Sequence, residues 1–270
     1  MKAFPIIILL AAYLVTLVQP SFAQDQEFPG RTTYPDVPFY TTDQLSKEYD
    51  DVIIVDVRSV YEFETLHIRD ALNIPINDKD YAKQLIAARG SEKQRPIVVY
   101  CNGFTCLKSY KAVLKARHAG VDNVYTYDAG VFEWTKTFPE RATLLGETPV
   151  NPDRLLSKQN LKEHMLKPDA FMSKSVSDAL ILDIREPYQH GMLEIFPLRQ
   201  KNIALSKKER LTGFLNKLKG SDQLLLVYDA TGRQVRWLQY YLEANNIKNY
   251  YFMEGGVAAY FDHLRVQLNK

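Results

Sequence analysis

Four short apolar runs along the chain have the pattern expected of buried strands. They occupy residues 52–55, 97–100, 179–182 and 224–228, and each is continuously apolar rather than alternating. The second and the fourth open into a turn followed by a helical stretch, which runs from about residue 108 to 119 after the second. Continuous apolar strands that alternate with helices are typical of a parallel sheet covered by helices on both faces. The pattern therefore predicts an α/β fold.

The same landmarks occur twice in the same order. The Asp-Val-Arg triplet after the first run returns 127 residues later as Asp-Ile-Arg, the second run returns after 128 residues, and the segment 127–131 returns after 126. Such near-constant spacing indicates a tandem repeat of one unit. We therefore expect two domains, at residues 24–146 and 153–270, joined by a linker at 147–152 that carries two prolines.

The first 23 residues read as a targeting segment rather than as part of the fold. Lys2 precedes an apolar run that ends at Val18, and the small-residue pattern Ser-Phe-Ala closes at Ala23. This order is typical of a secretory signal cleaved after Ala23. The run is shorter than the roughly 20 apolar residues that span a bilayer, although an uncleaved anchor remains an alternative. We expect a secreted, periplasmic protein that has no membrane contact after cleavage.

Composition narrows the class of protein. Of the 270 residues 46% are hydrophobic and 24% are charged, which is an ordinary globular composition and excludes disorder and collagen. A net charge of +2 lacks the concentrated basic excess that a nucleic-acid backbone requires, so no nucleic acid is expected as a partner. The chain has 2 cysteines, too few for a disulfide-stapled miniprotein.

One of these cysteines stands where a parallel sheet binds ligands. Cys101 directly follows the run 97–100 and precedes the predicted helix. Ligands of open parallel sheets bind beyond the carboxyl ends of the strands. The unpaired N–H groups and the dipole of a helix N-terminus favour an anion and lower the pKa of a nearby thiol. Cys101 is therefore a candidate nucleophile, and Lys108 at the helix start is a candidate contact for an anion.

Four ordered motifs of the first unit together resemble a rhodanese domain. The resemblance covers about residues 35–139, and a weaker second copy covers about 155–264. It implies two rhodanese-like domains, each with a parallel sheet and helices on both faces. The motifs are Asp56-Val57-Arg58, residues 67–75, residues 99–101 and residues 127–134.

The resemblance implies a sulfur transfer at Cys101. In this family the cysteine accepts a sulfane sulfur, becomes a persulfide cradled by N–H groups of its loop, and passes the sulfur to a thiophilic acceptor. The implied donor is a small sulfur anion such as thiosulfate or polysulfide, and the acceptor is a thiol or a protein. No metal or organic cofactor is implied. The implied substrate-binding residues are Arg58, Asn102, Gly103, Phe104, Thr105, Leu107, Lys108 and Ser109.

The second unit departs from the family pattern at two positions. Asp229 stands where the first unit has Cys101, and Glu194 stands where it has His67. A carboxylate cannot carry a transferable sulfur, and its charge would repel an anionic donor. We therefore expect the second domain to be degenerate and catalytically silent.

The loop after Cys101 departs from the pattern in length. It holds two more residues than its counterpart in the second unit, and residues 102–109 contain no arginine. Phosphoryl transfer favours a bidentate cation beside the nucleophile, so a phosphatase-like activity is poorly supported. The longer loop leaves the size of the substrate open.

The second cysteine, Cys106, lies in the same loop as Cys101. In an oxidising compartment the two form either a structural disulfide or a reactive pair. As a reactive thiol, Cys106 would resolve the Cys101 persulfide, accept its sulfur, or gate activity through a reversible disulfide. A permanent disulfide would instead indicate a non-catalytic binding module, and redox cycling of the pair would indicate a thiol–disulfide oxidoreductase.

Several polar and aromatic residues are expected to serve the fold. The Asp56 and Arg58 pair recurs in the second unit, which indicates an ion pair at a strand end. His67 is expected to pack rather than to act as a base. Trp237 and the Tyr240-Tyr241 pair have helical spacing and are expected to fill a core or the interface between units.

Overall fold

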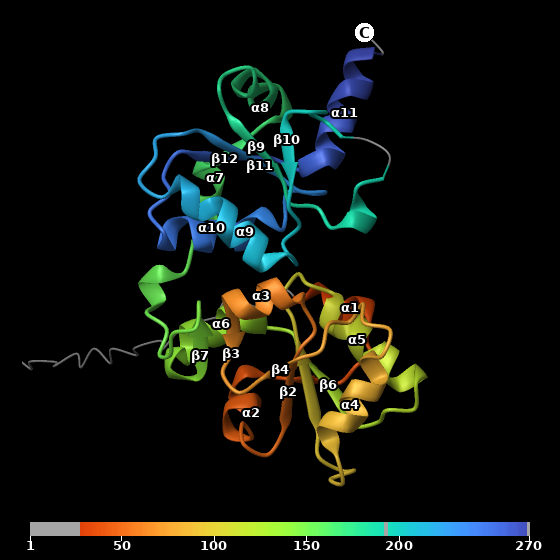
Figure 1. Cartoon of the computed structure of the whole chain (residues 1–270). Helices are drawn as coiled ribbons and strands as arrows, with labels where there is room; N and C mark the ends of the chain where they lie inside the picture. Colours follow the sequence, from red (N-terminus) through yellow and green to blue (C-terminus); the bar gives the residue numbers. More distant parts are fainter. Residues whose placement is uncertain (1–27, 192–193, 269–270) are drawn as a thin grey trace, which may run out of the picture.

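Two parallel sheets, each flanked by helices on both faces, form the molecule (Figure 1). The structure is a computed structural model and describes residues 28–191 and 194–268. This architecture confirms the predicted α/β fold. The predicted signal peptide, residues 1–23, lies outside the described residues. Within the described ranges no helix combines the length and the apolar character that crossing a bilayer requires.

The first unit has a five-stranded parallel sheet in the order β1-β6-β5-β2-β4. A short antiparallel pair of strands, β3 with β7, lies beside it. The predicted helix after Cys101 is confirmed as α5. The strands are β1 (Phe39–Tyr40), β2 (Ile53–Asp56), β3 (Leu66–Ile68), β4 (Leu72–Asn73), β5 (Ile97–Tyr100), β6 (Val124–Tyr127) and β7 (Ala142–Leu144); the helices are α1 (Pro29–Thr33), α2 (Thr42–Lys47), α3 (Val60–Thr65), α4 (Tyr81–Arg89), α5 (Lys108–His118) and α6 (Gly130–Thr137).

The central strands are continuously apolar because helices cover both faces of the sheet. Successive side chains of a strand point to opposite faces. Accordingly, Val55 and Val99 pack in the core under α4 and α5, whereas Ile54 and Val98 pack in the core under α2, α3 and α6. Every residue of β2 and β5 is buried. The two strands therefore hold their carboxyl ends, and the loops that follow them, in a fixed place.

The second unit repeats this arrangement. Its sheet has the order β10-β9-β11-β12-β8, which read from β8 matches the first sheet position by position. The two sheets therefore share one strand order. The strands are β8 (Met165–Leu166), β9 (Leu180–Asp183), β10 (Gln200–Asn202), β11 (Leu225–Tyr228) and β12 (Tyr250–Met253); the helices are α7 (Lys158–Glu163), α8 (Pro168–Ser175), α9 (Lys208–Leu215), α10 (Val235–Ala244) and α11 (Gly256–Leu268).

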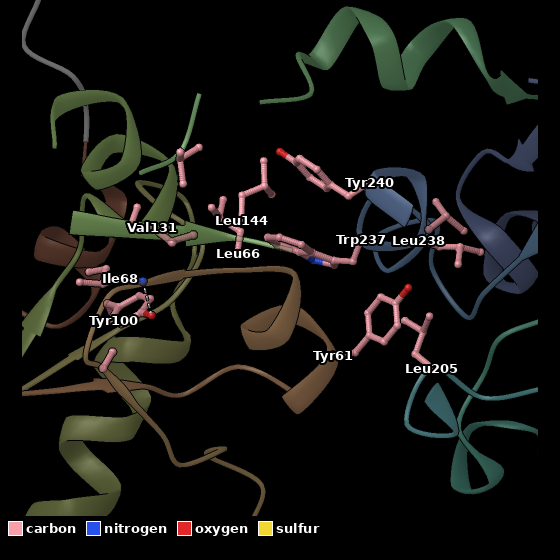
Figure 2. Packing of buried hydrophobic residues seen from close by; sticks show 14 of the residues in the cluster. Tyr61, Leu66, Ile68, Tyr100, Val131, Leu144, Leu205, Trp237, Leu238 and Tyr240 are labelled. Carbon is pink, nitrogen blue, oxygen red and sulfur yellow. Dashed lines mark hydrogen bonds between the residues drawn. The ribbon is translucent and has the colours of Figure 1, made fainter. Parts of the chain in front are cut away.

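The two units meet through one continuous apolar cluster. Helix α3 of the first unit contacts α10 of the second. Trp237 and Tyr240 project from α10 toward the first unit, and Tyr61 projects from α3 toward Leu205 (Figure 2). Trp237 is 2% exposed and Tyr240 3%, which confirms the expectation that these aromatic residues fill an interface.

Candidate active site

The site predicted from sequence is the loop between β5 and α5, and in the structure its two cysteines are joined. Cys101 and Cys106 form a disulfide with their Cα atoms 6.5 Å apart. Cys101 is 1% exposed, and Cys106 is half-buried. The Sγ of Cys101 lies 3.8 Å from the hydroxyl oxygen of the buried Ser109 on α5. Both sulfur atoms therefore lie at the carboxyl end of the central strand, before the N-terminus of α5.

The N-terminal end of helix α6 packs against the cysteine loop. The N–H of Val131 donates to the carbonyl oxygen of Cys101 at 3.0 Å. Gly130 has a φ of 72°, and a Cβ there would collide with the backbone of Gly103. Only glycine combines this backbone conformation with so close an approach. The start of α6 and the cysteine loop are therefore packed backbone against backbone.

A buried ion pair holds the other side of the loop. Arg58 and Asp56 are fully buried, and Nη2 of Arg58 lies 2.5 Å from Oδ2 of Asp56. A second nitrogen of Arg58, Nη1, donates to Oδ1 of Asn102 at 3.1 Å, and Nη2 also donates to the carbonyl oxygen of Leu66. The expected ion pair is confirmed, and it reaches the loop through Asn102. Direct contact of Arg58 with a substrate stays a prediction.

The side-chain amide of Asn102 links Arg58 to Glu62 of α3. Its Nδ2 donates to Oε1 of Glu62 at 3.3 Å, and Lys108 Nζ lies 3.9 Å from the other carboxylate oxygen of Glu62. Burial raises the pKa of Glu62, but the charges of Arg58 and Lys108 and hydrogen bonds from Ser59 bring it below its ordinary value. Glu62 is therefore an anion that holds Asn102 and offsets part of the Lys108 charge.

Four further residues predicted to bind the substrate are partly or fully exposed on the loop: Phe104, Thr105, Leu107 and Lys108. Phe104 is half-buried, and its ring meets Phe28 edge to face at a centroid distance of 5.0 Å. Thr105 and Lys108 are exposed, and Leu107 is half-buried. Contact of these residues with a substrate stays a prediction.

The sequence did not predict the segment that packs on Phe104, which consists of Phe28 and helix α1. Arg31 of α1 makes a bidentate pair with the buried Asp128, at 2.8 and 3.1 Å, and stacks over Phe28. Tyr110 of α5 donates to the same carboxylate at 2.5 Å. Helix α1 has five residues, too few for a hydrophobic periodicity to show in the sequence. The one signal for this segment in the sequence was Asp128, a charged residue within the motif 127–134.

In the second unit the corresponding loop binds its own carboxylate. Asp229 is 1% exposed and accepts hydrogen bonds from the backbone N–H groups of four residues of its loop. The loop is thus a cradle for an anion, filled by a side chain of the chain itself. The Asp183–Arg185 ion pair, at 2.7 Å, repeats that of the first unit. The four donors are Thr231, Gly232, Gln234 and Val235.

His67 lies apart from the cysteine loop. Its Nδ1 is 2.7 Å from the carbonyl oxygen of Phe63, and the two rings stack at 4.0 Å. Burial lowers its pKa, so the ring is neutral near pH 7. His67 lines a cavity of about 610 Å³ between the units, to which no residue from 101 to 109 contributes. The expected packing role agrees with this position.

Comparisons with known proteins find similarities to the first unit. Residues 41–137 match the rhodanese-like domain. A tRNA uridine(34) hydroxylase from Bdellovibrio bacteriovorus is 29% identical over 119 residues, which cover 44% of this chain and 33% of that protein. The corresponding protein from Erwinia tasmaniensis is 32% identical over 92 residues, 34% of this chain and 26% of that protein. The chain thus spans about a third or less of the length of these relatives.

Solved structures with a similar fold cover one or both units. A rhodanese-like domain from Anabaena is 26% identical with a TM-score of 0.34, and the match covers 42% of this chain and 86% of that domain. A thiosulfate sulfurtransferase from Pseudomonas aeruginosa is 16% identical with a TM-score of 0.36. That match covers 86% of this chain and 47% of that protein.

Proposed function

We propose that the first unit is a sulfurtransferase that carries a sulfane sulfur on Cys101 and works when the disulfide to Cys106 is reduced. One observation carries the proposal: a cysteine lies at the carboxyl end of the central strand, inside the residues that match the rhodanese-like domain. The second unit has no thiol, because both cysteines of the chain lie in this one loop.

The anion-binding loop of the second unit is an argument for an anionic intermediate in the equivalent loop of the first unit. In the second unit, backbone N–H groups of this loop bind the carboxylate of Asp229. A persulfide is also an anion, and it needs donors already in place when its charge forms. In the proposed intermediate the N–H groups between Asn102 and Ser109 bind the outer sulfur of Cys101.

The proposed reaction takes two displacement steps. The thiolate of Cys101 attacks the outer sulfur of thiosulfate, the sulfur–sulfur bond of the donor breaks, and its electron pair leaves with sulfite. Cys101 is then a persulfide. An acceptor thiolate attacks the outer sulfur of that persulfide, leaves as a persulfide itself, and returns Cys101 to the thiolate. A polysulfide donor reacts in the same way and leaves one sulfur shorter.

Cys106 has a proposed role as the resolving and gating thiol. Once the outer sulfur of the Cys101 persulfide has taken a proton from water, the thiolate of Cys106 attacks Sγ of Cys101. The sulfur–sulfur bond of the persulfide breaks, the outer sulfur leaves as hydrosulfide with that proton, and the disulfide forms. An external dithiol then reduces the disulfide and is itself oxidised. The bonded pair in the structure is the product state of this step.

The disulfide also supports a second candidate function. A pair of cysteines five residues apart, one half-buried, can exchange with the thiols of another protein. In that case the loop transfers electrons and no sulfur. If the disulfide is permanent, the protein is instead a non-catalytic binding module.

The proposed place of the reaction is the periplasm. This proposal rests on the secretory signal predicted for residues 1–23. Disulfides persist in such an oxidising compartment, so the gate requires a dedicated dithiol partner there.

Release of sulfite from thiosulfate tests the sulfurtransferase function. The reduced protein, given thiosulfate and a small thiol acceptor, should release sulfite catalytically, whereas Cys101→Ser should show no release above the uncatalysed rate. Asp222→Ser, at an exposed aspartate of the second unit, serves as the control and should keep the activity. Equal sulfite release from wild type and Cys101→Ser would refute the proposed function.

A further inference from the structure

Trp237 of the second unit packs against two residues of the first unit that support the cysteine loop, Arg58 and Phe132. This residue lies on α10, is 2% exposed, and belongs to the apolar cluster shared by both units (Figure 2). It takes no part in the reaction proposed above. Its neighbours are nevertheless the residues that hold the loop in place.

One route from Trp237 to the loop passes through the buried ion pair. The guanidinium carbon of Arg58 lies 5.0 Å from the centroid of the Trp237 ring. A cation over the face of an indole is attracted by the ring quadrupole, most strongly where water is absent. The same guanidinium donates to Asn102, the residue after Cys101, at 3.1 Å. Trp237 is thus two contacts from the side chain of Asn102.

A second route passes through α6. The ring of Phe132 stacks on Trp237 at a centroid distance of 5.5 Å, and the guanidinium of Arg236 lies over the Phe132 ring at 4.0 Å. Phe132 is therefore held by two consecutive residues of α10. It directly follows Val131, whose N–H binds the carbonyl oxygen of Cys101.

We infer that Trp237 is a positioning residue for the Cys101 loop, so that the second unit, though it carries no thiol, sets the geometry in which Cys101 meets Cys106. The inference rests on the proposed function in taking this loop as the reacting site. Aromatic contact with Arg58 and Phe132 supports the loop at its first two residues, Cys101 and Asn102. Without that contact Asn102 and the carbonyl of Cys101 lose part of their support.

The consequence is an effect on the redox equilibrium of the cysteine pair. Contacts that hold the loop in its disulfide geometry favour closure of the ring over the open dithiol. Loss of the Trp237 ring should lower the equilibrium constant for closure about tenfold, which raises the reduction potential by about 30 mV. Sulfur loading of Cys101 should slow as well, because the N–H cradle is then less well ordered.

The test compares three single substitutions in the full chain. Trp237→Leu retains apolar volume but offers no aromatic face, whereas Trp237→Phe retains the face. Tyr241→Phe is the matched control, because it lies on the same helix and loses only the hydroxyl that donates to Oδ1 of Asn216. The disulfide fraction is measured by thiol trapping in buffers of oxidised and reduced glutathione, and sulfite release is measured on the same samples.

The expected result is a raised potential and slower sulfite release in Trp237→Leu, with both restored in Trp237→Phe and unchanged in Tyr241→Phe. If Trp237→Leu does not fold, Trp237→Met fills more of the space and carries the same expectation. Wild-type potential and wild-type sulfite release in the folded Leu or Met variant would overturn the inference. A shifted potential in a protein that releases no sulfite at all would support the positioning role and refute the proposed function.

A double-mutant cycle identifies the route. If Trp237 acts through Arg58 and Asn102, the change in potential caused by Trp237→Leu should be smaller in an Asn102→Ala background. Additive changes would overturn this route, because residues that share no path contribute independently.

Discussion

At the scale of single residues, the chemistry depends on one thiol and its bonded neighbour. Cys101 is buried and Cys106 is half-buried, so a reductant reaches the disulfide from the side of Cys106. Attack at Cys106 releases Cys101 as the thiolate, which is the species that reacts with a sulfur donor. The reductant therefore attacks Cys106, the proposed gating thiol, and frees Cys101, the proposed sulfur carrier.

Replacement of Cys106 should separate sulfur loading from the gate. Cys106→Ser cannot form the disulfide, so it should release sulfite from thiosulfate without prior reduction, whereas the wild type should require a dithiol. The measurement is the sulfite-release rate with and without dithiothreitol. Ser91→Ala, at an exposed serine outside this loop, is the control and should retain the wild-type requirement for the dithiol. A Cys106→Ser protein that still depends on reductant would contradict the gate.

At the scale of elements, the two cradle loops differ in what fills them. The second loop wraps a carboxylate that is bound by four N–H groups, while the first holds a disulfide. Unsatisfied buried N–H groups are costly, so Asp229 stabilises the loop in which it lies.

Removal of this carboxylate should destabilise the second unit and uncover an anion site. Asp229→Ala should lower the free energy of unfolding by about 1–3 kcal/mol, the cost of leaving buried donors unsatisfied. Millimolar sulfate should then raise the melting temperature of Asp229→Ala more than that of the wild type, because the ion binds the folded state. Asp222→Ala, an exposed aspartate of the same unit, is the control. Equal effects of sulfate on Asp229→Ala and wild type would refute an anion cradle.

Much at the element scale could be predicted from the sequence. The central strands are continuously apolar and covered on both faces, so β2, β5, β9 and β11 were evident as runs. Edge strands such as β1 and β8 have two residues each, too few for any periodicity to register. The repeated Asp and Arg at each strand end predicted the ion pairs correctly, because a feature present in both units belongs to the scaffold.

At the scale of the whole molecule, the contacts between units could not be predicted. Helical spacing predicted that Trp237 fills a core or the interface between units, but its position over Arg58 depends on how the two units pack together. The state of the cysteine pair was likewise open, since spacing alone permits a disulfide or two thiols. Both questions are answered only by three-dimensional packing. The packing of Trp237 connects the second unit, which has no cysteine, to the first unit, which holds both cysteines.

The central claim is that Cys101 carries a transferable sulfur, and the mass of the intact protein tests it most directly. The reduced protein is incubated with thiosulfate, freed of small molecules and weighed by mass spectrometry in Cys106→Ser and Cys101→Ser forms. The account predicts a gain of one sulfur atom in Cys106→Ser, lost on addition of a thiol acceptor, and no gain in Cys101→Ser. An unchanged mass of Cys106→Ser with both thiosulfate and polysulfide would contradict it.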